Sequence, residues 1–66
     1  MEGKLLASAG TQEKLLELIR RYYCGNQTAT FADESGISPV FLNGQETGNT
    51  FVEYRRGRWR FIRWSA

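Results

Sequence analysis

The stretch that decides the fold is Thr50–Trp64, TFVEYRRGRWRFIRW, because its residue pattern predicts a β-hairpin. With Arg56 and Gly57 at the turn, opposed residues of the two strands point to the same face of the sheet. One face is then wholly apolar, whereas a slip of one residue would mix apolar with charged side chains. The residues of this apolar face are Val52, Tyr54, Trp59 and Phe61. A four-residue loop, Arg55–Arg58, would keep the same pairing, so the turn type stays open.

An amphipathic helix is predicted over about Thr11 to Cys24. Thr11 is a suitable N-cap, and Gly25 is a suitable residue to end the helix. Glu17 and Arg21 are four residues apart, which places their opposite charges side by side on the helix surface. Apolar residues recur at helical spacing and predict a stripe that packs on a sheet. They are Leu15, Leu16, Leu18, Ile19, Tyr22 and Tyr23.

The segment between the helix and the hairpin predicts two further strands joined by turns. Thr28–Ala32 alternates and is rich in β-branched residues, and Ile37–Leu42 follows after a turn at Asp33–Gly36. Asn43–Gly44 is the strongest short turn signal in the chain. Gln45–Asn49 is polar and contains glycine, so a loop is predicted there.

These elements predict one small domain of the α+β class that spans residues 1–66. One N-terminal amphipathic helix packs on one face of a three- or four-stranded antiparallel sheet, which ends in the C-terminal β-hairpin. Residues 1–10 fit either a strand or a flexible arm. A chain of this length buries only about 60% of its unfolded surface. Its single cysteine, Cys24, excludes an intramolecular disulfide, so support from a partner subunit is a hypothesis.

Positive charge is concentrated at the C-terminal end of the chain. Residues 1–53 have four basic and seven acidic side chains, whereas residues 54–66 have five arginines and no acid. Such local clustering favours the binding of polyanions. Arginine binds phosphate through its planar guanidinium group, and aromatic side chains stack on unpaired bases. The predicted nucleic-acid-binding residues are Arg55, Arg56, Arg58, Arg60 and Arg63.

The second hypothesis is a protein–protein interface on the opposite face of the hairpin. With one helix, no predicted element covers that face, so its apolar residues are either exposed or covered by a partner. A second copy of the chain and an acidic protein are the partners considered. Trp59 and Phe61 are needed for the core and Arg60 faces Glu53, which weakens the nucleic-acid hypothesis. The predicted interface residues are Phe51, Ile62 and Trp64.

The composition argues against an enzyme. The chain has no histidine, its acidic residues are scattered and its glycines are isolated, so no catalytic residue, cofactor or metal site is predicted. Cys24 follows a helix, where a thiolate is disfavoured, and is interpreted as buried or half-buried. Tyr22 and Tyr23 are interpreted as core-edge residues. Neither a signal peptide nor an apolar run of about 20 residues is visible, so a cytoplasmic protein without membrane contact is expected.

Overall fold

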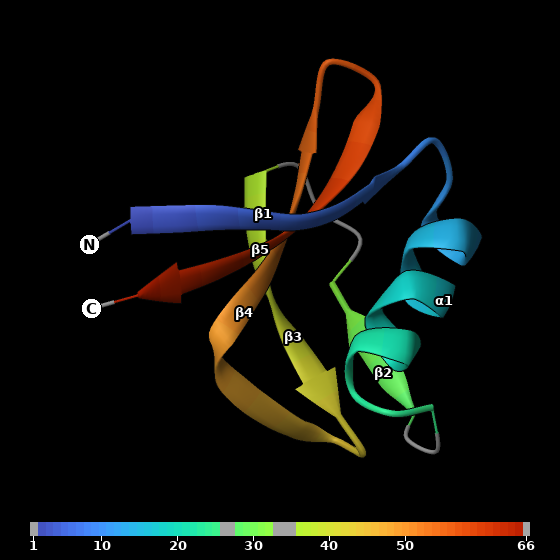
Figure 1. The fold of residues 1–66 in the computed structure, drawn as a ribbon, viewed down its shortest axis with the longest axis vertical. Coiled ribbons are helices and arrows are strands. Elements are labelled where there is room, and N and C mark those ends of the chain that lie inside the picture. Colours follow the sequence, from blue (N-terminus) through green and yellow to red (C-terminus); the bar gives the residue numbers. More distant parts are fainter. Residues whose placement is uncertain (1, 26–27, 33–35, 66) are drawn as a thin grey trace.

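The computed structural model describes residues 2–25, 28–32 and 36–65. The elements are β1 (Glu2–Ala9), α1 (Gln12–Tyr22), β2 (Ala29–Phe31), β3 (Gly36–Leu42), β4 (Gln45–Arg55) and β5 (Arg58–Ser65). The strands form one antiparallel sheet in the order β1-β5-β4-β3-β2, so β2 to β5 are a meander and β1 pairs with its last strand (Figure 1). The predicted α+β class is confirmed, with one described helix and a C-terminal hairpin, although the sheet has five strands rather than three or four.

The two strands predicted before the hairpin correspond to β2 and β3. β2 is shorter than predicted, and β3 begins one residue earlier, at Gly36. The rest of the turn predicted between them, residues 33–35, lies outside the described residues. β2 and β3 pair over three residues, which places Phe31 beside Val40 at the far edge of the sheet.

Residues 1–10, for which a strand and a flexible arm were both considered, contain β1. This strand pairs with β5 along its whole length. The register shifts between Leu5 and Ala7, because Leu5 pairs with Ile62 and Ala7 with Phe61. Leu6 is the extra residue of this β-bulge, and both Leu6 and Ala7 pack against the core. The apolar run Leu5–Ala7 therefore lies in a strand whose side chains do not simply alternate between the two faces.

The β4–β5 hairpin has the predicted register. Val52 pairs with Phe61, and the pairs that a turn at Arg56 and Gly57 requires on either side of it are also present: Phe51–Ile62, Glu53–Arg60, Tyr54–Trp59 and Arg55–Arg58. The φ angles are 53° at Arg56 and 78° at Gly57. Two positive values at a two-residue turn define type I′. The hairpin therefore has the two-residue turn and not the four-residue loop that was also considered.

Replacing Arg56 with asparagine is expected to raise the free energy of unfolding by about 0.5–1 kcal/mol, because the left-handed conformation costs an ordinary L-residue about 1–2 kcal/mol. The turn between β3 and β4 has the same geometry and uses Asn43, with φ 52°. Urea unfolding measures the change. The reverse substitution, Asn43→Arg, is the matched control and should destabilise, since Asn43 Oδ1 also accepts a hydrogen bond from Thr28 N at 3.0 Å. An unchanged or lower stability for Arg56→Asn would contradict the expectation.

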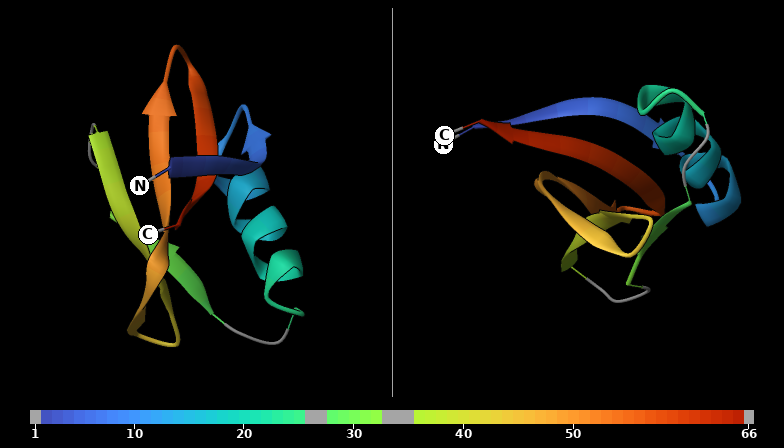
Figure 2. Two further views of the ribbon diagram at one scale, coloured as in Figure 1. Left: turned by 60° about the vertical axis from the view of Figure 1, so that its left-hand side comes forward. Right: turned by 90° about the horizontal axis from the view of Figure 1, so that it is seen from below.

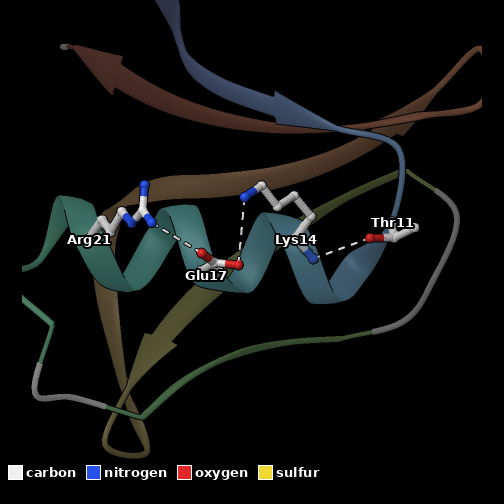
Figure 3. A network of polar contacts seen from close by, with 4 residues as sticks. All are labelled: Thr11, Lys14, Glu17 and Arg21. Atoms are coloured by element: carbon white, nitrogen blue, oxygen red, sulfur yellow. Dashed lines mark hydrogen bonds and ion pairs between the residues drawn. The ribbon is translucent and has the colours of Figure 1, made fainter.

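The start of α1 is confirmed at the predicted N-cap. Thr11 Oγ1 accepts a hydrogen bond from Lys14 N at 3.2 Å. Figure 3 shows Glu17 between Lys14 and Arg21, with its carboxylate 3.7 Å from Lys14 Nζ and 3.2 Å from Arg21 Nη2. These side chains are exposed, so the cap is the more important contribution to the helix.

The end of α1 differs from the prediction by two residues, since the helix ends at Tyr22. The N–H of Cys24 donates to Arg21 O at 3.1 Å, and the N–H of Gly25 donates to Arg20 O at 2.7 Å. This pair of hydrogen bonds is a Schellman motif. Cys24 takes its left-handed position, with φ 70°, and is exposed. The interpretation of Cys24 as buried or half-buried is therefore wrong. The chain turns away from the core at Cys24, one residue before Gly25, which was predicted to end the helix.

The core lies between α1 and the inner face of the sheet, which is the face turned toward the helix. α1 contacts β1, β5 and β2 and lies along one side of the curled sheet (Figure 2). Two residues expected in the core are largely at the surface, with exposed fractions of 42% for Tyr22 and 46% for Tyr54. Tyr22 is the last residue of α1, and Tyr54 lies near the hairpin tip, which projects past the helix (Figure 1). The buried core consists of Ala9, Leu15, Ile19, Ala29, Val40, Val52 and Phe61.

The loop predicted at Gln45–Asn49 is wrong, because this stretch is the first half of β4. The register between β3 and β4 shifts here, and Gly48 has φ 85°. Thr47 Oγ1 lies 2.6 Å from Thr50 Oγ1 and accepts a hydrogen bond from Thr50 N at 3.3 Å. Thr50 is buried and also bonds to the Tyr23 hydroxyl at 2.9 Å. These hydroxyl contacts keep a polar stretch in the sheet, and they confirm Tyr23 as a core-edge residue.

Candidate interaction site

The outer face is the side of the sheet turned away from α1. Its residues alternate along the strands with the core positions, and the strand register places them in rows. One row joins Leu5, Ile62, Phe51 and Pro39 across four strands. The outer face includes Gly3, Leu5, Ser8, Ile37, Pro39, Phe41, Glu46, Phe51, Glu53, Arg55, Arg58, Arg60, Ile62 and Trp64.

A shallow hollow of about 250 Å³ lies on this face. Leu5 from β1 and Ile37 from β3 stand at its border, and each is 49% exposed. Ile62 is 7% exposed and contributes the least accessible part of the lining. The full lining is Gly3, Leu5, Ile37, Glu53, Arg55, Arg60, Ile62 and Trp64, which come from four strands. The hollow thus has apolar walls and one charged side.

Gly3 has a packing role in this site. A Cβ atom at this position would lie 3.1 Å from Ile62 Cγ2 and 3.5 Å from the Trp64 ring. The missing side chain lets β1 lie close against these two outer-face residues. The pairing of Gly3 with Trp64 and of Leu5 with Ile62 therefore builds one wall of the hollow.

The three predicted interface residues all lie on the outer face. Phe51 pairs with Ile62, and its ring meets the Trp64 ring edge to face, with centroids 6.5 Å apart. Phe51 and Trp64 are partly exposed, whereas Ile62 is covered by its neighbours within the chain. The residues that sequence reasoning missed are Leu5 and Ile37, which are more accessible than Ile62. A predicted pairing of residues 1–10 with the last strand of the hairpin would have identified Leu5, since it lies opposite Ile62.

Three of the five predicted phosphate-binding arginines contact other side chains of the protein. Arg60 Nη1 donates to Glu53 Oε1 at 2.8 Å. Arg58 donates to the Ser8 hydroxyl from Nε at 3.2 Å and from Nη2 at 3.0 Å. Arg63 pairs with Thr50, so it projects from the inner face, where its Nη1 is 3.4 Å from the hydroxyl of Tyr22. The five arginines are therefore divided between the two faces.

Arg55 and Arg56 have no hydrogen bond or ion pair with any described residue. Arg55 lines the hollow, and Arg56 forms the turn next to it. Both side chains are exposed at the hairpin tip. Among the described residues, the two arginines without any polar contact are thus located at one end of the outer face, whereas Arg63 carries its charge on the inner face.

The aromatic residues are not interleaved with these arginines on one surface. Trp59 lies on the inner face, with its ring 4.6 Å from that of Tyr54 and 5.5 Å from that of Phe31. Trp59 also packs against the core. Its faces are therefore used inside the fold, which leaves Phe51 and Trp64, with Phe41 near the β3–β4 turn, as the aromatic residues of the outer face.

The ion pair between Glu53 and Arg60 is expected to couple the two residues by about 1 kcal/mol. The side chains are 20% and 30% exposed, which places the pair between surface and buried examples. A double-mutant cycle with Glu53→Ala, Arg60→Ala and the double variant, followed by urea unfolding, measures the coupling. The exposed pair between Glu17 and Arg21 is the control and should couple less. Equal coupling in both pairs would show that the outer-face pair is as solvated as the helical one.

No family model matches this chain, and neither a curated protein nor a solved structure shows a significant match. Among the described residues, no group of three or more histidine, cysteine or acidic side chains is placed to hold a metal ion. No helix in the described part of the chain is long and apolar enough to cross a membrane. The chemistry of the outer face is therefore the basis for a proposed function.

Proposed function

We propose that this protein is a small, non-enzymatic binding module whose outer face docks a segment of a partner protein. The observation that supports this most strongly is the hollow bordered by the half-exposed Leu5 and Ile37. Leucine and isoleucine gain about 1.5–3 kcal/mol when their side chains are fully buried, so a partner that covers them gains binding energy. Single exposed apolar residues are common, but here two of them border one concave site.

The size of the hollow favours a protein segment over a small molecule. Ligand pockets typically enclose about 300–1,000 Å³ and cover most of the ligand. A shallow hollow of about 250 Å³ accommodates one or two side chains. Aromatic residues and arginine around an apolar centre are also the residues enriched at protein interfaces, and Trp64 and Arg55 supply both.

The charge of the hollow favours a different protein over a second copy of this chain. Glu53 and Arg60 neutralise each other, which leaves Arg55 as the unpaired charge of the lining. A two-fold interface centred on the hollow would bring the same patch of both copies together. The interface would then contain the Arg55 charges of both copies, and the acid of the described lining, Glu53, is already paired with Arg60, so the two charges would stay without a counter-charge, which is unfavourable.

Peptide display tests the proposal. A random linear peptide library is selected on the immobilised protein and then on the Leu5→Asp variant. We expect peptides that bind the unchanged protein and do not bind the Leu5→Asp variant. Sedimentation of the unliganded protein is measured in parallel, and a monomer is expected. A dimer that Leu5→Asp dissociates would show that a second copy occupies the face, and the absence of any discriminating peptide would also overturn the proposal.

A second candidate function is nucleic-acid binding at the hairpin tip. Arg56 occupies a left-handed turn position that asparagine or glycine fills more easily, and an unfavourable backbone of this kind is often kept where a side chain has a function. Arg55 flanks it, and the one described hydrogen-bond acceptor of Arg58 is the neutral hydroxyl of Ser8. These three guanidinium groups are the ones available to a phosphate backbone, whereas Arg63 projects from the other face.

If the hairpin tip binds duplex DNA through these three arginines, the logarithm of the affinity should fall with the logarithm of salt concentration with a slope of about −3. Arg56→Asn should make the slope shallower by about one unit, because it removes one phosphate contact while preserving the turn. Fluorescence anisotropy with labelled single- and double-stranded oligonucleotides measures both quantities. Arg63→Gln is the matched control and should leave the slope unchanged. No binding at low salt would eliminate this candidate.

A further inference from the structure

We infer that the partner segment carries a carboxylate beside an apolar anchor, so that the anchor enters the hollow while the carboxylate pairs with Arg55. This inference rests on the proposed function. It adds the chemistry of the partner, which follows from how charge and apolar surface are arranged around the hollow.

The apolar half of the site is formed by β1, β3 and the end of β5. Leu5 and Ile37 border the hollow and are each 49% exposed, while Ile62 and Trp64 lie between the strands. No described element covers this area, because α1 packs on the inner face. An apolar side chain of a partner gains the most here, since it removes two half-exposed walls from water at once.

The polar half of the site has a net positive charge. The Glu53 carboxylate is held by Arg60 at 2.8 Å, so it offers no free charge to a ligand. Arg55 lines the hollow without a described partner, and Arg58 lies opposite it with only the Ser8 hydroxyl as acceptor. The guanidinium group of arginine matches a carboxylate with two parallel hydrogen bonds.

The remaining described acid on this face is Glu46. It pairs with Phe41 near the β3–β4 turn, at the end of β4 away from Arg55. The positive charge beside the hollow is therefore not balanced within the described part of the face. An anionic group on the partner supplies the missing charge, and that group must lie close to the anchor, because Arg55 lines the same hollow as Leu5 and Ile37.

The experiment uses peptides selected on the intact protein. In each selected peptide, the acidic residue nearest the apolar anchor is replaced by its amide, and dissociation constants are measured by fluorescence anisotropy at about 0.15 M salt. The amide peptide should bind about tenfold more weakly, as expected for loss of a hydrogen bond to a charged group. The protein variant Arg55→Gln should show the same loss and should no longer distinguish the two peptides.

Reversal of the charge at residue 55 is the decisive part of this experiment. Arg55→Glu should weaken the acidic peptide further and should bind a peptide with lysine at that position better than the unchanged protein does. Arg63→Gln, on the other face, is the matched control and should change nothing. Selected peptides without an acid, or equal binding of acid and amide forms, would overturn this inference while leaving the proposed function intact. Peptides that bind the Leu5→Asp variant equally well would overturn the proposed function itself.

Discussion

Replacing Phe61 with alanine is expected to lower the free energy of unfolding by about 3–5 kcal/mol. Phe61 has no exposed surface, lies opposite Val52 in the central hairpin, and meets the rings of Tyr22 and Tyr23 at centroid distances of 5.4 and 6.3 Å. A domain of 66 residues is expected to have about 3–10 kcal/mol of stability in total. The variant should therefore lose about a third or more of its total stability, as measured by circular dichroism and urea titration.

Leu5→Ala is the matched control for this prediction. Leu5 is also an apolar residue of the sheet, but it is 49% exposed and lies on the outer face. Its loss should lower the stability by less than about 1 kcal/mol, because a half-exposed side chain gains only part of the transfer free energy on folding. If both variants lost equal stability, the division into a structural inner face and an available outer face would be incorrect.

Leu5→Asp is expected to weaken binding of the selected peptides by about 10- to 100-fold. The full burial of a leucine contributes about 1.5–3 kcal/mol, and an ionised carboxylate at the border of an apolar hollow adds a desolvation penalty. Isothermal titration calorimetry measures the loss. The fold should survive, since the position is half-exposed on an edge strand.

Lys4→Asp is the control for this substitution. It places the same new residue on the same strand, but Lys4 pairs with Arg63, whose side chain projects from the inner face. Lys4 is exposed, so no packing is lost. The control should bind peptides as tightly as the unchanged protein. A similar loss in both variants would indicate a general effect of charge and not a contact made by Leu5.

The hairpin could be predicted from sequence because its pattern admits only one register. Val52 lies opposite Phe61 when the hairpin is centred on Arg56 and Gly57, and the structure has this pairing. The start of the helix was equally clear, because the threonine side chain at its N-cap acts locally. In both places the sequence signal and the structure depend on neighbouring residues alone.

Three features could not be predicted, because composition and periodicity do not indicate the bulge, the side-chain contacts or the backbone conformation on which they depend. β1 lacks alternation because a bulge at Leu6 turns two successive residues toward the core. The stretch Gln45–Asn49 has polar composition, yet hydroxyl contacts between Thr47 and Thr50 keep it within β4. The end of the helix was misplaced because Cys24 adopts a conformation usually left to glycine.

The candidate site was predicted only in part, because two of its strand pairings join residues distant in sequence. Phe51, Ile62 and Trp64 were placed on the correct face by the hairpin register. The hollow itself requires β1 beside β5 and the start of β3 beside β4, which brings Leu5 and Ile37 to its border. Neither contact is visible in local periodicity. The arginines were read as one cluster because strand alternation, which sends Arg63 to the other face, was not applied beyond Ile62.

The measurement that tests the central claim most directly is amide chemical-shift mapping of the isotopically labelled protein with one selected peptide. Docking on the outer face predicts the largest shifts at Gly3, Leu5, Ile37 and Trp64, with smaller shifts at Arg55. The exposed surface of α1, around Lys14 and Glu17, should remain unchanged. Shifts centred on α1, or confined to the turn at Arg56 and Gly57, would contradict the assignment of the outer face as the binding site.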